Sequence, residues 1–218
     1  MTKSLYLMRH GETLFNTQKR IQGWCDSPLT ELGQDQARQA RAYFEEAGLT
    51  FDALYCSTAE RTADTLELVT GRTDYKRLKG LREWGFGRME GQPEYLHPTP
   101  QPGQIGHGDY YKIHHGGESQ EELGQRIKGA VFDIAERTAE GETVLAVSHA
   151  GALMNFMFQL DLKAYPLLHI SNCIIFHYEV EDGQFHLVEL IDPITGQVFP
   201  SIYPSLEEVT ADFFKNHK

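Results

Sequence analysis

Four basic residues in this sequence stand at or just beyond the ends of short apolar runs. They are Arg9, His10, Arg61 and His149, and the runs are residues 5–8, 53–56 and 143–147. Arginine guanidinium groups match phosphate oxygens in pairs, and a neutral imidazole is a good nucleophile toward phosphorus. These residue types therefore predict a site for a phosphate dianion, with a covalent step on a histidine, if the fold brings them together.

His10 has the properties of the nucleophile. Neighbouring arginine charges would depress its pKa and keep its imidazole neutral at pH 7. Attack on phosphorus would then leave a phosphohistidine. We expect five residues to hold the phosphate. Arg9 and Arg61 would contribute guanidinium groups, His149 a second imidazole, Asn16 its side-chain amide and Ala150 a backbone N–H at a helix start. No cluster of Asp, Glu or Cys accompanies them, so we expect no metal and no other cofactor.

The departing alkoxide needs a proton, and Glu83 is the candidate donor. It lies in the glycine-rich loop 81–91 beside Trp84 and Phe86, and an aromatic surround would raise the pKa of its carboxyl. The same group could activate the water that releases phosphate. Three other carboxylates compete for the role: Glu12, Glu90 and Glu118.

The loop 16–27 supplies candidate contacts to the rest of the substrate. We expect Arg20, Gln22 and Gly23 to bind the leaving group. A packed Trp24 with a surface arginine is an equally good interpretation of this loop. Four histidines of the segment 92–117, which are His97, His107, His114 and His115, lack carboxylates or cysteines at ligand spacing and are interpreted as solvated loop residues.

Strand and helix patterns alternate along the chain, which indicates an α/β sandwich with a mainly parallel sheet. We expect helices over 30–47, capped by Thr30 and ended by Gly48, over 58–69, capped by Ser57 or Thr58, over 119–140 and over 152–160. Further expected elements are a strand at 75–78, a hairpin of 173–181 with 184–190 at the sheet edge, and a helix over 206–214. Parallel strands end on one edge of a sheet, so the residues that follow 5–8, 53–56 and 143–147 should meet in one crevice.

Length and composition narrow the alternatives. The 218 residues suit one domain, 1–218, in which the Pro- and His-containing segment 92–117 forms a lid on the substrate side. A net charge of −11 argues against a general nucleic-acid binder. Three scattered cysteines suggest neither disulfides nor zinc, and no apolar run reaches the roughly 18 residues of a membrane span. We expect a cytoplasmic protein whose partner is a small phosphorylated metabolite.

Five sequence blocks, in this order, resemble the histidine phosphatase superfamily in its phosphoglycerate mutase-like branch. The blocks are residues 7–13, 22–30, 57–61, 82–87 and 148–151, with Gly117-Glu118-Ser119 also in agreement. The resemblance implies a three-layer α/β/α sandwich that needs neither metal nor nucleotide. It also implies that His10 is phosphorylated, that Glu83 donates the proton, and that the phosphate pocket consists of Arg9, Asn16, Arg61 and His149.

The resemblance leaves two enzyme classes to compare. Family mutases follow the acidic loop with a Gly-Leu-Asn-Lys-like stretch, whereas this chain has Gly91-Gln92-Pro93-Glu94. We therefore favour a phosphatase for small phosphomonoesters over a cofactor-dependent phosphoglycerate mutase. A third hypothesis, a non-catalytic sensor of phosphorylated ligands, is disfavoured because every residue assigned to catalysis is present.

Overall fold

The structure is a computed structural model that describes residues 2–99, 107–160 and 170–200. Its centre is a seven-stranded sheet in the order β3-β2-β4-β1-β5-β6-β7. The strands are β1 (Lys3–Arg9), β2 (Ala53–Ser57), β3 (Lys76–Leu78), β4 (Thr143–Ser148), β5 (Ile175–Glu181), β6 (Gln184–Asp192) and β7 (Gln197–Pro200). Strands β1 to β4 are mutually parallel. Strand β5 pairs antiparallel with β1, β6 with β5, and β7 with β6.

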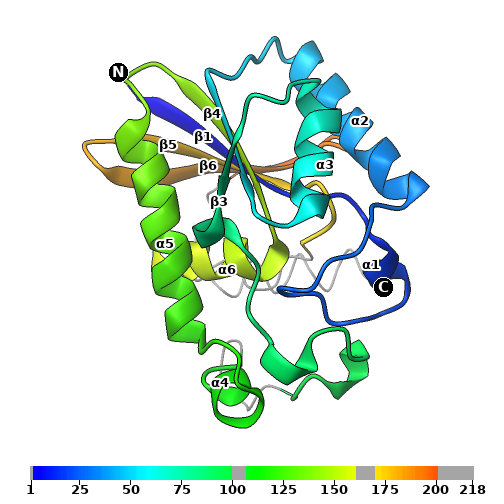
Figure 1. Ribbon diagram of the computed structural model, residues 1–218. Helices are drawn as coiled ribbons and strands as arrows, with labels where there is room; N and C mark the ends of the chain where they lie inside the picture. The colour runs from blue at the N-terminus through cyan, green and yellow to red at the C-terminus, as the bar shows by residue number, and fades with distance from the viewer. Residues whose placement is uncertain (1, 100–106, 161–169, 201–218) are drawn as a thin grey trace.

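Helices cover both faces of this sheet, as Figure 1 shows. The helices α2 (Glu31–Glu46) and α3 (Glu60–Thr70) pack on one face, and α5 (Gln120–Arg137) and α6 (Ala150–Gln159) pack on the other. Successive β1 side chains alternate between the two cores, because side chains of a strand point to opposite faces. Leu5 and Leu7 join the α5–α6 core, and Tyr6 joins the core of α2 and α3. The expected three-layer α/β/α sandwich is confirmed.

The helix ends follow local chemistry. Thr30 caps α2 by accepting a hydrogen bond from the Gly33 N–H, and Ser119 forms a capping box with Glu122 at the start of α5. The expected cap of α3 is wrong: Ala59 occupies the N-cap position and gives no side-chain hydrogen bond. The carboxylate of Asp26, from a distant loop, accepts from the Glu60 N–H instead. Ser57 accepts from the Ala59 N–H, one residue before the helix.

The parallel strands deliver their polar ends to one edge. Arg9 of β1 lies opposite Ser148 of β4, and the His10 N–H donates to the Ser148 carbonyl at 3.1 Å. The next strand, β2, pairs with β4 on its other side and ends at Ser57. The three segments that carry His10, Arg61 and His149 therefore start from adjacent strands, as the alternation of elements predicted.

Several element predictions need correction. The segment 92–117 is not wholly irregular, since it contains α4 (Tyr110–His115), with Tyr111 buried against the core. Residues 14–17 form a short helix, α1 (Leu14–Thr17), and α6 begins at Ala150 rather than at residue 152. The hairpin β5–β6 is not at the edge, because β7 pairs outside it. The expected helix over 206–214 lies outside the described residues.

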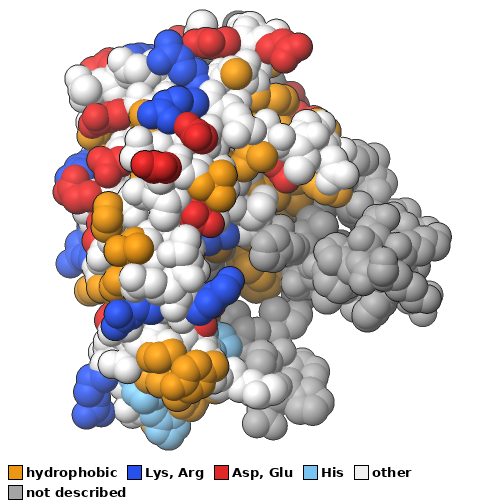
Figure 2. Space-filling view, turned by 90° about the vertical axis from the view of Figure 1, so that its right-hand side faces the viewer, with side chains coloured by type: hydrophobic (Ala, Val, Ile, Leu, Met, Phe, Trp, Pro, Cys, Tyr) orange, Lys and Arg blue, Asp and Glu red, His pale blue; other side chains and the backbone are white. Residues whose placement is uncertain are grey.

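The surface is mixed in charge. On the face in Figure 2, acidic and basic side chains are interspersed over one half, and a hydrophobic patch lies beside histidine side chains at one end. Within the described ranges, no helix is long and apolar enough to cross a bilayer.

Candidate active site

His10 is buried at the end of β1, and its hydrogen bonds define its tautomer. Nδ1 lies 2.8 Å from the Gly11 carbonyl oxygen, which can only accept, so Nδ1 carries the proton. Nε2 therefore presents its lone pair and accepts a 3.3 Å hydrogen bond from Arg61 Nε. Burial, and then the charges of Arg61 and Arg9, lower the pKa of His10 well below 6.5. The imidazole is neutral at pH 7, as a nucleophile must be.

Arg61 is completely buried on the first turn of α3 and uses all five of its N–H groups. Three of them hold the guanidinium in place, through hydrogen bonds to the Cys25 carbonyl at 3.0 Å, the Gly23 carbonyl at 2.9 Å and the Asp26 carboxylate at 2.8 Å. The other two point at imidazole nitrogens of His10 and His149. Those two are the donors that an anion between the histidines would take over.

His149 is buried at the N-cap of α6, and it is also neutral. Arg61 Nη2 lies 2.9 Å from Nδ1, and an arginine can only donate, so Nδ1 accepts. Nε2 then carries the proton and donates to the Ser57 hydroxyl at 2.8 Å. Burial, Arg61 and His10 lower the pKa of His149 well below 6.5. Its ring centroid lies 5.2 Å from that of His10.

The remaining predicted phosphate ligands, Arg9, Asn16 and Ala150, differ in how far their polar groups are already engaged. Arg9 donates through Nη1 to the Ile170 carbonyl, while its buried Nε has no partner. Burial lowers the pKa of Arg9, and the nearby Glu83 carboxylate counteracts that shift. Oδ1 of Asn16 accepts a hydrogen bond from the Thr13 N–H in the capping box of α1. The NH₂ of the amide is therefore the group that could donate to a ligand. Ala150 is the first residue of α6, where backbone N–H groups lack intrahelical partners.

Glu83 is buried and lies at the N-terminus of α6. Its carboxylate accepts from the Trp84 N–H at 2.8 Å and from the Gly151 N–H at 2.9 Å. Burial raises the pKa of Glu83, although these two donors and the charges of Arg61 and Arg9 oppose the rise. Gly151 is needed for this approach, because a Cβ there would lie 2.5 Å from the Glu83 carboxylate. Of the two aromatic residues named beside Glu83 in the sequence, Trp84 adjoins it and is buried, and Phe86 stacks on Trp84.

The three competing carboxylates are engaged elsewhere. Glu12 accepts a hydrogen bond from the Thr30 hydroxyl, and Glu118 forms a two-point ion pair with Arg126. Glu90 accepts from four backbone N–H groups and also interacts with the Cys25 thiol. The Glu83 carboxylate raises the pKa of Arg9, and the charges of Arg61 and Arg9 in turn act to lower the pKa of Glu83.

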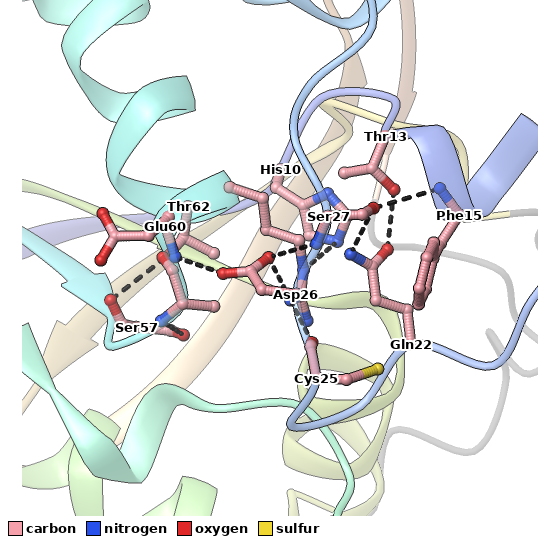
Figure 3. Close-up of polar contacts among 12 residues, drawn as sticks. His10, Thr13, Phe15, Gln22, Cys25, Asp26, Ser27, Ser57, Glu60 and Thr62 are labelled. Carbon is pink, nitrogen blue, oxygen red and sulfur yellow. Dashed lines mark hydrogen bonds and ion pairs between the residues drawn. The ribbon is translucent and has the colours of Figure 1, made fainter. Parts of the chain in front are cut away.

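The predicted leaving-group contacts are held in local networks. Gln22 accepts from the Thr13 hydroxyl and donates to Ser27, and Figure 3 shows these three side chains joined on one side of Asp26. Gly23 gives its N–H to Glu90. Arg20 is exposed, donates through Nε to the Gly91 carbonyl and lies over the Phe15 ring. Trp24 packs under Arg82 and donates to the Glu83 carbonyl.

Two supporting residues were missed from the sequence. Asp26 is the carboxylate paired with the buried Arg61, and Figure 3 shows it between the Ser27 side and the Ser57–Glu60 side of the site. Arg126 of α5 donates to the carbonyls of Gly80, Arg82 and Glu83, and so fixes the loop that carries the acid. Asp26 follows Trp24-Cys25 in one of the quoted blocks, which was the available signal. No sequence signal pointed to Arg126, because it lies in a helical pattern with nothing to mark it as part of the site.

The histidines of segment 92–117 are not all solvated. His97 and His107 are half-buried and stacked, with ring centroids 5.6 Å apart, and burial lowers the pKa of His97 to about 4. They pack against Trp84 and Phe86. Among the described residues, no group of three or more His, Cys, Asp or Glu side chains is arranged to hold a metal ion.

Comparisons with known proteins point to one superfamily. The model of the histidine phosphatase superfamily (branch 1) matches residues 5–193. A probable phosphoglycerate mutase, GpmB, of Salmonella paratyphi B is 30% identical over 213 residues, which cover 94% of this chain and 98% of the relative.

Solved structures with this fold include both enzyme types. YhfR of Bacillus stearothermophilus is 32% identical with a TM-score of 0.72, covering 85% of this chain and 95% of that one. A phosphoglycerate mutase of Bacillus anthracis is 25% identical with a TM-score of 0.76 and 96% coverage of both chains. A phosphoserine phosphatase mutant of Entamoeba histolytica, complexed with phosphoserine, is 25% identical with a TM-score of 0.69, covering 86% of this chain and 96% of that one.

Proposed function

The chain belongs to the histidine phosphatase superfamily (branch 1), and we propose that it is a cytoplasmic, metal-independent phosphatase of small phosphomonoesters. His10 is the proposed nucleophile, Glu83 the general acid and base, and Arg9, Arg61 and His149 the main phosphate ligands, assisted by Asn16 and Ala150. The leaving-group role of Arg20, Gln22, Gly23 and the segment 92–117 stays a prediction, as does the organisation of residues 1–218 as a single domain.

One observation carries the proposal: the proton on Nδ1 of His10 is held by the Gly11 carbonyl, so the Nε2 lone pair faces Arg61, and Arg9 adds a second nearby positive charge. In the first step Nε2 attacks phosphorus and the P–O bond to the leaving group breaks. The two Arg61 N–H groups that now point at imidazoles would bind phosphoryl oxygens as charge shifts onto them. The product is a phosphohistidine and a free alkoxide.

Glu83 balances the protons of both steps. Because burial raises the pKa of its carboxyl, the acid can hold a proton and give it to the departing alkoxide oxygen. The resulting carboxylate then takes a proton from water as that water attacks phosphorus. The P–N bond to His10 breaks, phosphate leaves, and the starting protonation state returns.

A phosphoglycerate mutase is the second candidate, and the 30% identical relative named as a probable mutase favours it. A mutase must retain its phosphohistidine until the product-side hydroxyl attacks, whereas a phosphatase has only to admit water. The stretch Gly91-Gln92-Pro93-Glu94 after the acidic loop, where family mutases resemble Gly-Leu-Asn-Lys, supports the phosphatase.

The deciding experiment screens the purified protein with EDTA present throughout. The panel contains a generic aryl phosphate, phosphoserine, both phosphoglycerates and phosphorylated sugars, with phosphate release as the readout. We expect hydrolysis of at least one ester, and an acid-labile phosphoenzyme in rapid quench. Activity abolished by EDTA would contradict the metal-free mechanism.

Interconversion of 3- and 2-phosphoglycerate is assayed in parallel, with and without a bisphosphoglycerate primer. Primer-dependent interconversion that outruns hydrolysis of every ester would select the mutase. Tight phosphate binding with no phosphoenzyme and no turnover of any ester would instead indicate a sensor.

A further inference from the structure

The carboxylate of Glu90 is surrounded by backbone N–H groups. Oε1 accepts from Trp24 at 2.8 Å and from Phe86 at 3.0 Å, and Oε2 accepts from Cys25 at 2.9 Å and from Gly23 at 3.1 Å. Hydrogen bonds to a charged acceptor are about twice as strong as neutral ones. One side chain thus gathers three consecutive residues of one loop and a fourth from the loop that carries Glu83.

The carbonyls of the same three residues point at guanidinium groups. Those of Gly23 and Cys25 accept from Arg61, and that of Trp24 accepts from Arg82 at 2.8 Å. The peptide between Gly23 and Trp24 therefore has its N–H on the Glu90 anion and its carbonyl on the Arg61 cation. The dipole of that peptide is favourably oriented toward both charges, which couples the position of Arg61 to Glu90.

The loop has little freedom to adopt another arrangement. A Cβ on Gly23 would lie 2.5 Å from Glu90 Oε1 and 2.1 Å from the Trp84 carbonyl oxygen. The backbone at residue 23 is therefore packed directly between the two loops. A shift of Glu90 has to move the carbonyls that hold Arg61.

We propose that Glu90 is a positioning residue for phosphate recognition, which acts on Arg61 through the backbone of residues 23–25. This inference rests on the proposed role of Arg61 in binding phosphate. It differs from the role of a second proton donor, because the carboxylate of Glu90 is held by four backbone N–H groups and lies beside the Cys25 thiol. Glu90 acts on binding of the phosphoryl group rather than on the leaving group.

The test compares Glu90→Gln and Glu90→Asp with the wild type and with Glu45→Gln. The control removes a carboxylate from an exposed i,i+4 pair with Arg41. Glutamine would turn an NH₂ toward N–H donors, and aspartate keeps the charge but is too short to reach all four. Calorimetry with inorganic phosphate and with vanadate measures anion binding, and circular dichroism shows which variants are folded.

We expect both Glu90 variants to bind phosphate and vanadate about 10- to 100-fold more weakly, the scale of loss for a misplaced binding group. The kcat/KM should fall by a similar factor for aryl and alkyl phosphates alike, while Glu45→Gln stays at the wild-type value. Unchanged anion affinity in folded Glu90→Asp or Glu90→Gln would overturn the proposal. So would a loss confined to alkyl phosphates, since that marks a proton donor. A wild-type protein that neither binds phosphate nor hydrolyses any ester would refute the proposed function instead.

Discussion

Arg61 Nη2 donates a hydrogen bond to Nδ1 of His149 across 2.9 Å, and this contact fixes the imidazole in a form that cannot donate to an anion at that nitrogen. Nε2–H is committed to Ser57. For His149 to contribute a hydrogen bond to a bound phosphate, Nδ1 must first gain a proton. We therefore expect His149 to take up a proton when a phosphate dianion binds beside it.

Proton uptake by His149 can be measured directly. A phosphate dianion beside Nδ1 favours the charged imidazolium and raises its depressed pKa. Titration of phosphate at pH 7 in buffers of different ionisation enthalpy should show net uptake of up to one proton beyond that expected for phosphate itself. His149→Asn should abolish the excess uptake and weaken binding. Equal uptake in the variant would assign the proton to another group.

Replacement of His10 should remove the covalent step. His10→Ala is expected to lower kcat on an aryl phosphate by more than about a thousandfold, since loss of a covalent nucleophile costs orders of magnitude. The phosphoenzyme trapped in acid-labile form should disappear as well. Phosphate binding should survive in part, because the guanidinium groups remain. Retention of the phosphoenzyme signal would move the nucleophile to a different residue.

Glu83 should govern the alkaline side of the pH profile for poor leaving groups. Its pKa is raised by burial, and only the protonated acid can donate, so kcat/KM for an alkyl phosphate should fall as pH rises through that pKa. On the acid side, activity persists well below pH 6.5, because the pKa of His10 is depressed. Glu83→Gln should flatten the alkaline limb and slow alkyl esters about 10²–10⁴-fold, with a smaller effect on an activated aryl ester. An alkaline limb that persists in the variant would exclude Glu83 as its source.

Asp26 should affect both the stability of the fold and anion affinity. It pairs with the buried Arg61 and accepts the Glu60 N–H at the start of α3. Asp26→Asn should lower the free energy of unfolding by about 1–3 kcal/mol and weaken phosphate binding through misplacement of the guanidinium. Asp74→Asn, which breaks an exposed pair with Arg72, is the matched control and should change neither. If phosphate binds Asp26→Asn more tightly than the wild type, repulsion between the Asp26 charge and the anion outweighs the effect of Asp26 on the position of Arg61.

Stability should decrease as the pH is lowered below about 6.5. His10 and His149 have folded-state pKa values well below the 6.5 of an unfolded histidine. Between those values the unfolded chain binds more protons, so the stabilisation present above pH 6.5 is lost as pH falls. Glu83 has the opposite sign, because its raised pKa stabilises the fold at low pH and that contribution is lost as pH rises through it.

Urea unfolding at pH 7 and at pH 5 checks this expectation. The decrease in the free energy of unfolding between the two pH values should be smaller for His10→Ala than for the wild type. It should be unchanged for His186→Ala, which alters an exposed histidine of β6. An equal decrease in His10→Ala and the wild type would show that His10 does not titrate as proposed.

The sheet and its catalytic edge could be predicted because local patterns suffice for both. The apolar runs that end at Arg9, Ser57 and Ser148 are β1, β2 and β4 with little change of bounds, and adjacent parallel strands place their ends together. His10, Arg61 and His149 meet for that reason alone. The helix cap at Thr30 was equally local.

The supporting contacts were not predictable, because each joins residues far apart in sequence. The carboxylate that caps α3 and holds Arg61 comes from Asp26, 34 residues before Glu60. The same holds for the competing carboxylates. Glu90 and Glu118 could not be distinguished from Glu83 by sequence, and it is their hydrogen-bond partners, backbone N–H groups for Glu90 and Arg126 for Glu118, that distinguish them in the structure. The edge strand β7 was not predicted, because four residues are too few to show an alternating pattern.

The hydrogen bonds of His10, Arg61, His149 and Glu83 have a consequence for how such a protein can diversify. Among the described residues, none of these bonds involves the segment 92–117. Their partners outside this set of four include residues 11, 23–26, 57, 65, 84, 126, 148, 151, 153, 172 and 173. A different segment at this place would leave these hydrogen bonds as they are, but it would have to keep the core packing of Tyr111 and the contacts of His97 and His107 with the loop that carries Glu83. We expect chimaeras that carry this segment from relatives, with those contacts kept, to change which alcohol is released, if the segment has the predicted leaving-group role.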